Sequence, residues 1–129
     1  MKLITGGVCA AKGFKANGIH CGIRKNHSKK DLALIVSDVP ASAAAVYTTN
    51  LVKGAPLTVT KQNISNGIAR AVICNSGNAN TCNANGIEIA EGMCKLVEQH
   101  TGIAASEAAV ASTGVIGQLL DLNPIANGM

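Results

Sequence analysis

The sequence predicts a single domain of the mixed α/β (α+β) class over residues 1–129. Three observations predict this class. Short apolar runs rich in strand-forming residues occupy 31–37, 43–48 and 69–74, and one segment, 87–100, spaces its apolar side chains at the helical period. The 14 glycines indicate many tight turns or close backbone approaches. Strand runs that gather early in the chain, with helices after them, favour a layered arrangement.

The first predicted unit is a β-hairpin. Residues 14–24 alternate loosely between apolar and polar side chains, and 31–37 form a short apolar strand. A polar turn at 26–30 connects the two. The apolar run 43–48 predicts a third strand, and Pro40 marks the turn before it.

The segment 56–64 allows two interpretations. Its Val and Thr content favours a strand, whereas Pro56 would suit the first turn of a helix, and the sequence leaves both open. Residues 69–74 are continuously apolar and predict a buried strand. They run directly into Asn-Ser-Gly-Asn-Ala-Asn at 75–80, which predicts a turn.

Residues 87–100 give the clearest helix signal. Ile87, Cys94 and Val97 fall on one apolar face, and charged side chains occupy the opposite side. The residue before the helix, Asn85, is a candidate N-cap, and a glycine follows the helix at position 102. The sequence therefore predicts an amphipathic helix with defined ends.

The segment 108–117 carries the strongest candidate for chemistry, and a last helical turn is predicted to begin near Leu122. A short buried strand at 108–112 leads into Thr113 and Gly114, which offer a side-chain O–H and a bare backbone N–H together. Two such donors, fixed in place, are what an oxyanion hole requires. The spacing alone favours an ordinary Ser-Thr-Gly turn over an oxyanion hole.

Other nucleophiles and metals find little support in the sequence. Thr113 has no general base placed by sequence, and Ser76 does not stand in the G-x-S-x-G pattern of hydrolases. A zinc site is conceivable from Cys74, Cys82, Cys94 and His100. Their spacing, however, fits no common zinc pattern. We expect neither a metal nor another cofactor.

Charge and cysteine content limit the function classes. Residues 1–30 hold seven Lys or Arg and no acidic residue, whereas 31–129 carry a net charge of −3. A binding module for nucleic acid could use this basic segment and the G-x-x-G loop 114–117, but the loop centre is apolar and no aromatic platform is present. Five cysteines without a CxxC pair indicate free thiols in the cytoplasm, and no apolar run is long enough to span a membrane.

Six blocks of the chain carry a family resemblance, and they are 7–14, 30–35, 44–50, 52–56, 75–80 and 111–117. Taken in order, they resemble the ornithine acetyltransferase family, which includes the bifunctional glutamate N-acetyltransferases of arginine biosynthesis. The last two read Asn-Ser-Gly-Asn-Ala-Asn and Ala-Ser-Thr-Gly-Val-Ile-Gly, as in the family. Cys9 and Ala11 depart from the usual Thr and Pro of the opening block. The resemblance covers essentially the whole chain.

The resemblance implies a fold and a reaction. The fold is the layered α-β-β-α sandwich of the ornithine acetyltransferase/aminopeptidase DmpA-like type, here incomplete. Family members cleave themselves before a threonine, which becomes the N-terminal nucleophile of a second chain. That threonine takes acetyl from N2-acetyl-L-ornithine and passes it to L-glutamate, and bifunctional members also accept acetyl-CoA. The resemblance assigns the oxyanion hole to Thr113 and Gly114.

The resemblance also implies partners and a boundary. The expected partners are the beta chain of the same precursor, in a heterotetramer of two alpha and two beta chains, and the small-molecule substrates, without nucleic acid or membrane. The processing motif around Ala-Thr-Met-Leu does not occur in residues 1–129. We therefore expect an N-terminal portion of the alpha chain that stops before the processing site, with the substrate-binding residues beyond residue 129.

Overall fold

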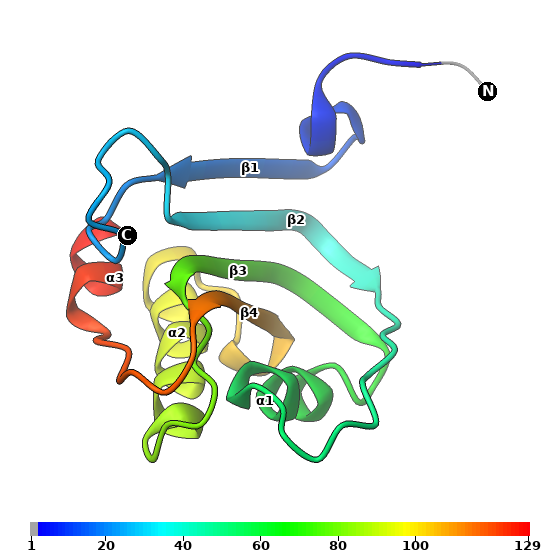
Figure 1. The fold of residues 1–129 in the computed structure, drawn as a ribbon. Helices are drawn as coiled ribbons and strands as arrows, with labels where there is room; N and C mark the ends of the chain where they lie inside the picture. The colour runs from blue at the N-terminus through cyan, green and yellow to red at the C-terminus, as the bar shows by residue number, and fades with distance from the viewer. Residues whose placement is uncertain (1–2) are drawn as a thin grey trace.

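The computed structural model describes residues 3–129, which form one mixed sheet and three α-helices (Figure 1). The strand order is β1-β2-β3-β4, with β1–β2 and β2–β3 antiparallel and β3–β4 parallel. The strands are β1 Phe14–Ile19, β2 Leu32–Ser42, β3 Ile68–Asn78 and β4 Ala108–Val115. The helices are α1 Ala55–Asn63, α2 Gly86–Thr101 and α3 Asn123–Gly128, with short 3-10 turns at Gly7–Ala10 and Ala105–Glu107. The predicted mixed α/β class is confirmed.

The predicted hairpin is present, with a longer connection than expected. β1 and β2 pair from Phe14 opposite Ser37 to Ile19 opposite Leu32. β1 ends at Ile19, so the connection is 20–31 and not the short turn 26–30. The added residues fold around a buried carboxylate, which is described with the site below.

The predicted third strand at 43–48 is wrong. β2 continues through Pro40 to Ser42, and residues 43–54 contain neither helix nor strand. Pro40 lies between Val36 and Ala41, where the register between β2 and β3 shifts. Proline has no N–H to donate to a regular ladder, but it is tolerated at such an irregularity because the regular pairing is interrupted there. The apolar run after it has no neighbouring strand, and Val46 is 99% exposed.

Helix α1 resolves the ambiguous segment in favour of the helix. Pro56 occupies its first turn, where a missing N–H costs nothing. The helix lies against the outer strand β4, because the Thr60 hydroxyl donates to the Val110 carbonyl (2.8 Å) and accepts from the Val110 N–H (2.9 Å). This pair satisfies backbone groups of β4, which is an edge strand of the sheet formed by residues 3–129.

Helix α2 matches its prediction closely. Asn85 is the N-cap residue, although its side chain makes no capping hydrogen bond, and Gly102 ends the helix at φ +72° with its N–H on the Glu98 carbonyl. Ile87 was expected on the buried face but is 42% exposed, whereas Ile89 is 8% exposed. The apolar face is therefore rotated slightly from the predicted one. No helix within the described residues is both long and apolar enough to span a membrane.

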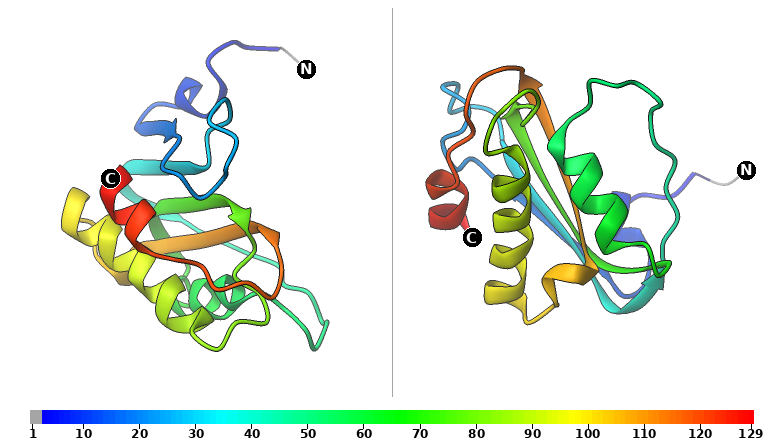
Figure 2. Two further views of the ribbon diagram at one scale, coloured as in Figure 1. Left: turned by 60° about the vertical axis from the view of Figure 1, so that its left-hand side comes forward. Right: turned by 90° about the horizontal axis from the view of Figure 1, so that it is seen from below.

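The two faces of the sheet have different surroundings. Helices α2 and α3 lie on the same side of it (Figure 2), packed over the side chains of Leu32, Ile73 and Val110, which belong to the buried core. We call this the helix face. Alternate residues of the same strands form the open face, whose side chains are half-buried or exposed. The open face comprises Ala33, Ile35, Val72, Cys74, Ser76, Ala109, Ala111 and Thr113.

Candidate functional site

The parallel pairing of β3 and β4 brings together the two segments that the sequence singled out. Asn75 pairs with Ser112, Ser76 with Thr113, and Gly77 with the glycine at 114. Residues 75–78 belong to β3, so the predicted turn at 75–80 is wrong over its first four positions. Turn-forming residue types continue the strand here because β4 runs beside them and pairs with their backbone.

The two strand ends touch through their glycines. Gly114 has φ +136°, and a Cβ on it would lie 2.3 Å from the carbonyl carbon of Gly77 and 2.5 Å from the backbone nitrogen of Asn78. Only glycine fits such an approach between two backbones. The pairing shifts register after Gly77, as at a β-bulge. The peptide that follows Thr113 is therefore held against β3.

Buried asparagines tie these strand ends to the loop that follows β4. The Asn78 side chain donates to the Gln118 carbonyl (2.9 Å) and accepts from the Asn80 N–H (2.8 Å). Asn75 donates to the Asn78 carbonyl (2.9 Å), and Asn80 donates to the carbonyl of Gly86 at the start of α2 (2.8 Å). All three asparagines are at most 6% exposed. The network fixes the position of Thr113 and Gly114, because breaking hydrogen bonds between buried polar groups costs free energy.

Thr113 presents its side chain on the open face and is exposed. It lines a hollow of about 270 Å³ together with Lys30, Asp31, Cys74 and Ser76. Burial raises the pKa of the Cys74 thiol, so this cysteine lines the hollow in its neutral form. Of the two predicted donor residues, Thr113 therefore lines an open hollow beside the strand ends.

A carboxylate that the sequence reasoning missed organises the connection 20–31. Asp31 is 2% exposed, and its carboxylate accepts the backbone N–H groups of Cys21 (2.6 Å) and Arg24 (2.8 Å). His20 Nδ1 lies 3.2 Å from the same carboxylate. Burial by itself raises the pKa of Asp31, but these donors stabilise the charged form and hold the pKa below its ordinary value.

Asp31 also joins this connection to the candidate site. Its backbone carbonyl accepts the Ser76 N–H (2.8 Å), and the Arg24 side chain donates from Nε (3.1 Å) and Nη2 to the Ser76 hydroxyl. The only sequence signal for this arrangement was one acidic residue directly after a basic stretch. The contact partners lie 52 positions apart, so no local pattern could have paired them.

The zinc hypothesis fails in the structure. No three metal-ligating side chains among residues 3–129 come together. Cys94 is buried on α2 beside the Asn63 amide, and burial raises the pKa of its thiol to about 11. It is a core residue, as isolated cysteines usually are.

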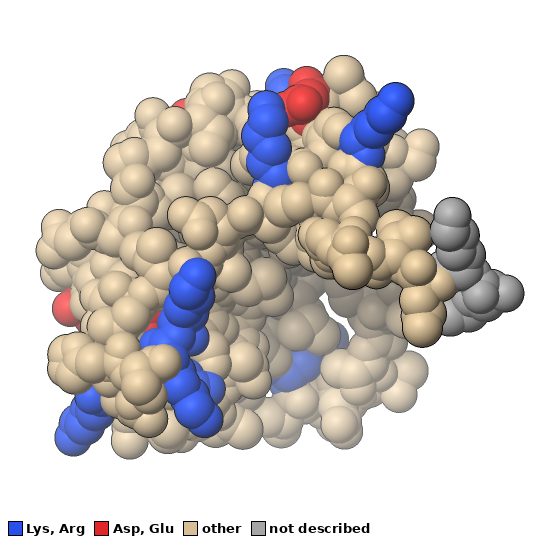
Figure 3. Space-filling view, turned by 90° about the horizontal axis from the view of Figure 1, so that it is seen from above, with Lys and Arg blue, Asp and Glu red and all other residues tan. Residues whose placement is uncertain are grey.

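The nucleic-acid alternative gains no support either. Val115 and Ile116, at the centre of the G-x-x-G loop, are 48% and 61% exposed and bring no charge to it. On the face seen in Figure 3, Lys and Arg stand in separate groups and not in a continuous stripe. Lys15, in the basic segment, is paired with Asp38 at 2.7 Å.

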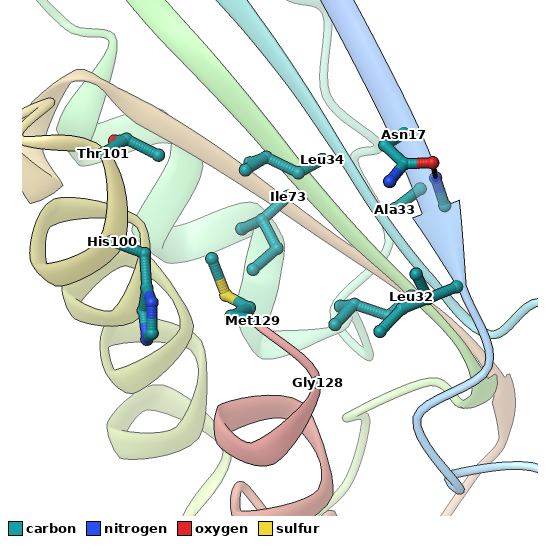
Figure 4. A pocket seen from close by; sticks show the side chains of 11 residues that line it. Asn17, Leu32, Ala33, Leu34, Ile73, His100, Thr101, Gly128 and Met129 are labelled. Carbon is teal, nitrogen blue, oxygen red and sulfur yellow. Dashed lines mark hydrogen bonds between the residues drawn. The ribbon is translucent and has the colours of Figure 1, made fainter.

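A second hollow, of about 250 Å³, lies on the helix face between the sheet and the end of α2 (Figure 4). Its lining includes Leu34, Ile73 and Met129, with His100 at one side. These apolar side chains offer no group of catalytic residues. The strand ends of β3 and β4 therefore remain the candidate site.

Together, these features define an α/β protein whose candidate site is built from the ends of two parallel strands. The chain belongs to the ArgJ family, whose sequence profile matches residues 15–129. It is 48% identical to the arginine biosynthesis bifunctional protein ArgJ of Bacillus cereus over 99% of its own length, and 44% identical to the protein of that name in Streptococcus thermophilus. It covers 31% and 32% of those two relatives, respectively, and so spans about a third of their length.

Two solved structures share the fold closely. The crystal structure of arginine biosynthesis bifunctional protein argJ from Bacillus halodurans matches with a TM-score of 0.92 at 47% identity, covering 99% of this chain and 67% of that one. The ornithine acetyltransferase of Mycobacterium tuberculosis, crystallised with ornithine, matches with a TM-score of 0.85 at 39% identity, covering 95% of this chain and 66% of that one. The predicted family is confirmed.

Proposed function

We propose that this chain is the N-terminal part of an arginine-biosynthesis enzyme that transfers acetyl from N2-acetyl-L-ornithine to L-glutamate. The reaction passes through an acyl-threonine intermediate. In this chain the Thr113 hydroxyl and the Gly114 N–H form the oxyanion hole for that step. The threonine nucleophile and the substrate-binding residues come from the part of the relatives' length that this chain does not span.

One observation carries the proposal. Thr113 and Gly114 stand at a strand end where the neighbouring backbone permits only glycine at position 114. Donors held in this way do not reorganise when negative charge develops beside them, which is the basis of catalysis by an oxyanion hole. The hollow on the open face, lined by Thr113, leaves space for an acyl group beside this residue.

The proposal extends to assembly and location. We place a beta chain, released from the same precursor by self-cleavage, against this chain in a heterotetramer of two alpha and two beta chains. The described cysteines are free thiols, which supports a reducing cytoplasm as the location. Acceptance of acetyl-CoA as a second acetyl donor belongs to the bifunctional form of the same proposal.

The proposal is tested in an extended protein, in which this chain is joined to the segment of the Bacillus cereus relative that follows the matched region. We expect acetyl transfer from N-acetylornithine to glutamate, and no transfer by the 129-residue chain alone. Thr113→Ala should lower kcat by about 10²-fold, because one oxyanion donor contributes on that order. Thr113→Ser should keep most of the activity, since it retains the hydroxyl.

The matched control is Thr58→Ala, which removes an exposed threonine on α1. It should leave kcat unchanged. Failure of the extended protein to transfer acetyl would contradict the proposed activity. Full activity in Thr113→Ala would contradict the assigned oxyanion hole while leaving the activity itself standing.

A further inference from the structure

An arginine at the edge of the candidate site holds a serine hydroxyl. Arg24 donates from Nε (3.1 Å) and from Nη2 to Oγ of Ser76. The ion pairs among residues 3–129 are Lys15–Asp38 and His20–Asp31. The half-buried Arg24 side chain therefore binds a neutral hydroxyl, and its guanidinium forms no ion pair with a described carboxylate.

The surrounding chain holds this contact in place. The buried Asp31 carboxylate binds the backbone N–H of Arg24, and its backbone carbonyl binds the N–H of Ser76. A Cβ on Gly77 would lie 2.9 Å from Ile23 Cγ2 and 3.0 Å from Arg24 Cγ, so the connection packs directly on β3. Because three interactions fix its approach, the guanidinium is preorganised on the serine.

The hydrogen bonds from Arg24 determine what the Ser76 hydroxyl can do. A serine Oγ has two lone pairs and one hydrogen. The Ser76 oxygen accepts both N–H groups of Arg24, so the hydroxyl hydrogen points away from the guanidinium and is free to be donated. A cation on the acceptor side polarises the O–H bond and makes it a stronger donor.

The Ser76 hydroxyl lies on the same face of the sheet as the Thr113 side chain on the neighbouring strand. Ser76 pairs with Thr113 across the parallel β3–β4 ladder, so both side chains stand on the open face, on strands about 4.8 Å apart. Both residues line the same hollow. A hydrogen that Ser76 donates into this hollow therefore lies on the same side of the sheet as the Thr113 hydroxyl.

We propose that Ser76, polarised by Arg24, is a third hydrogen-bond donor to the developing oxyanion of the acyl group, beside Thr113 and Gly114. Arg24 is a positioning residue that acts through Ser76. This inference rests on the proposed acyl transfer and adds a donor to it. The ligand class is the anionic tetrahedral centre formed when a nucleophile attacks an amide or ester carbonyl.

The test uses the extended protein described above. Ser76→Ala and Arg24→Gln should each lower kcat about 10- to 100-fold with KM within about two-fold, because the donor acts on the transition state. The kcat of the double variant should be no lower than that of the slower single variant, since Arg24 acts only through Ser76 and the two losses are not additive. Arg24→Lys should recover part of the loss, because it restores the charge without the two-pronged contact.

Lys25→Gln is the matched control, because it removes one positive charge from the adjacent exposed position. It should leave kcat unchanged. An extended wild-type protein without acetyl transfer overturns both proposals, whereas an active one whose Ser76→Ala kinetics are unchanged overturns this proposal alone. Loss confined to KM, or additive losses in the double variant, also overturns it.

A readout independent of activity protects the test against misfolded variants. In the nuclear magnetic resonance spectrum of the 129-residue chain, the Arg24 Nε–H should exchange slowly with water, and Ser76→Ala should abolish this protection. Exchange as fast as that of an exposed arginine overturns the proposal. Should Ser76→Ala fail to fold, the Arg24→Gln and Arg24→Lys pair decides the kinetic question.

Discussion

The helix face and the open face of the sheet use the same strands for different purposes. On the helix face, Ile73 is fully buried and Val110 is 4% exposed, both within the core below α2 and α3. On the open face, their strand neighbours Val72 and Ala109 are only half-buried, and the candidate donors face a hollow. A side-chain period of two along each strand produces this division.

The difference in burial between the two faces separates the residues that stabilise the fold from the candidate site residues. Apolar burial on the helix face stabilises the sheet, so the open face can carry hydroxyls and small side chains without weakening the core. The glycines at 77 and 114 serve both purposes, because their backbones hold the strand ends together. Substitutions on the two faces should therefore have separable effects.

The largest effect is expected where the faces meet, at Gly114. Gly114→Ala places a Cβ 2.3 Å from the Gly77 carbonyl carbon at φ +136°, so the strand ends must separate. We expect a loss of at least about 4 kcal/mol in the free energy of unfolding, measured by urea denaturation.

The control for this prediction is Gly117→Ala. Gly117 also has a positive φ (+76°), but nothing lies within 4 Å of its Cβ position. It should cost only about 1 kcal/mol, the usual penalty for a left-handed alanine. Equal losses in the two variants would mean that backbone conformation, and not the contact with β3, requires glycine at 114.

The next largest effect compares two isoleucines on adjacent strands. Ile73→Ala on the helix face should lower the free energy of unfolding by about 3–4 kcal/mol, because it empties a fully buried position. Ile35→Ala on the open face should cost about 1 kcal/mol, since this side chain is only half-buried.

Urea unfolding of the isolated chain measures both isoleucine variants. Similar losses would show that the open face contributes as much packing as the helix face. In the extended protein, a rise in the cost of Ile35→Ala would indicate that a further part of the protein covers the open face.

A smaller effect is expected at Asp31, which connects the 20–31 segment to β3. Asp31→Asn should cost about 2 kcal/mol near neutral pH, because charged hydrogen bonds to backbone N–H groups are lost. The folded-state pKa of Asp31 lies below the unfolded value of about 3.9. Its contribution is therefore complete above that value and declines as the pH falls through the folded pKa.

Urea titrations from pH 7 down to about pH 2.5 check this dependence. The difference between the wild type and Asp31→Asn should stay constant above about pH 5 and narrow below about pH 4. Asp38→Asn is the control, because the exposed Lys15–Asp38 pair should contribute less than about 0.5 kcal/mol. A difference that grows on acidification would contradict the assigned role of the carboxylate.

Local patterns predicted the parts of the fold that depend on local physics. The helix 86–101, the hairpin and the buried strand at 69–74 follow from side-chain periodicity, which a single segment contains in full. The strand predicted at 43–48 is wrong because a strand also needs a partner. The turn predicted at 75–80 fails over 75–78 because β4 supplies a partner there.

The candidate site also contains residues that the sequence predicted and residues that it missed. The sequence singled out Thr113 and Gly114 as donors and noted the asparagine-rich segment 75–80, but it could not place the two side by side. Arg24 and Asp31 were missed, because their roles depend on how the 20–31 connection folds onto β3. A side chain that acts through a contact across 52 positions leaves no periodic signal.

The smallest stability effect should come from the residue proposed to matter most for turnover. Thr113→Ala removes an exposed hydroxyl from the open face and should change the free energy of unfolding by less than about 0.5 kcal/mol. Thr60→Ala is the matched control. It removes the hydroxyl that both donates to and accepts from Val110, and should cost about 2 kcal/mol. In the extended protein the ranking should reverse, with the larger loss of kcat in Thr113→Ala. If Thr113→Ala instead costs as much stability as Thr60→Ala, its hydroxyl belongs to the structure of the strand end, and any loss of turnover no longer assigns it to the oxyanion.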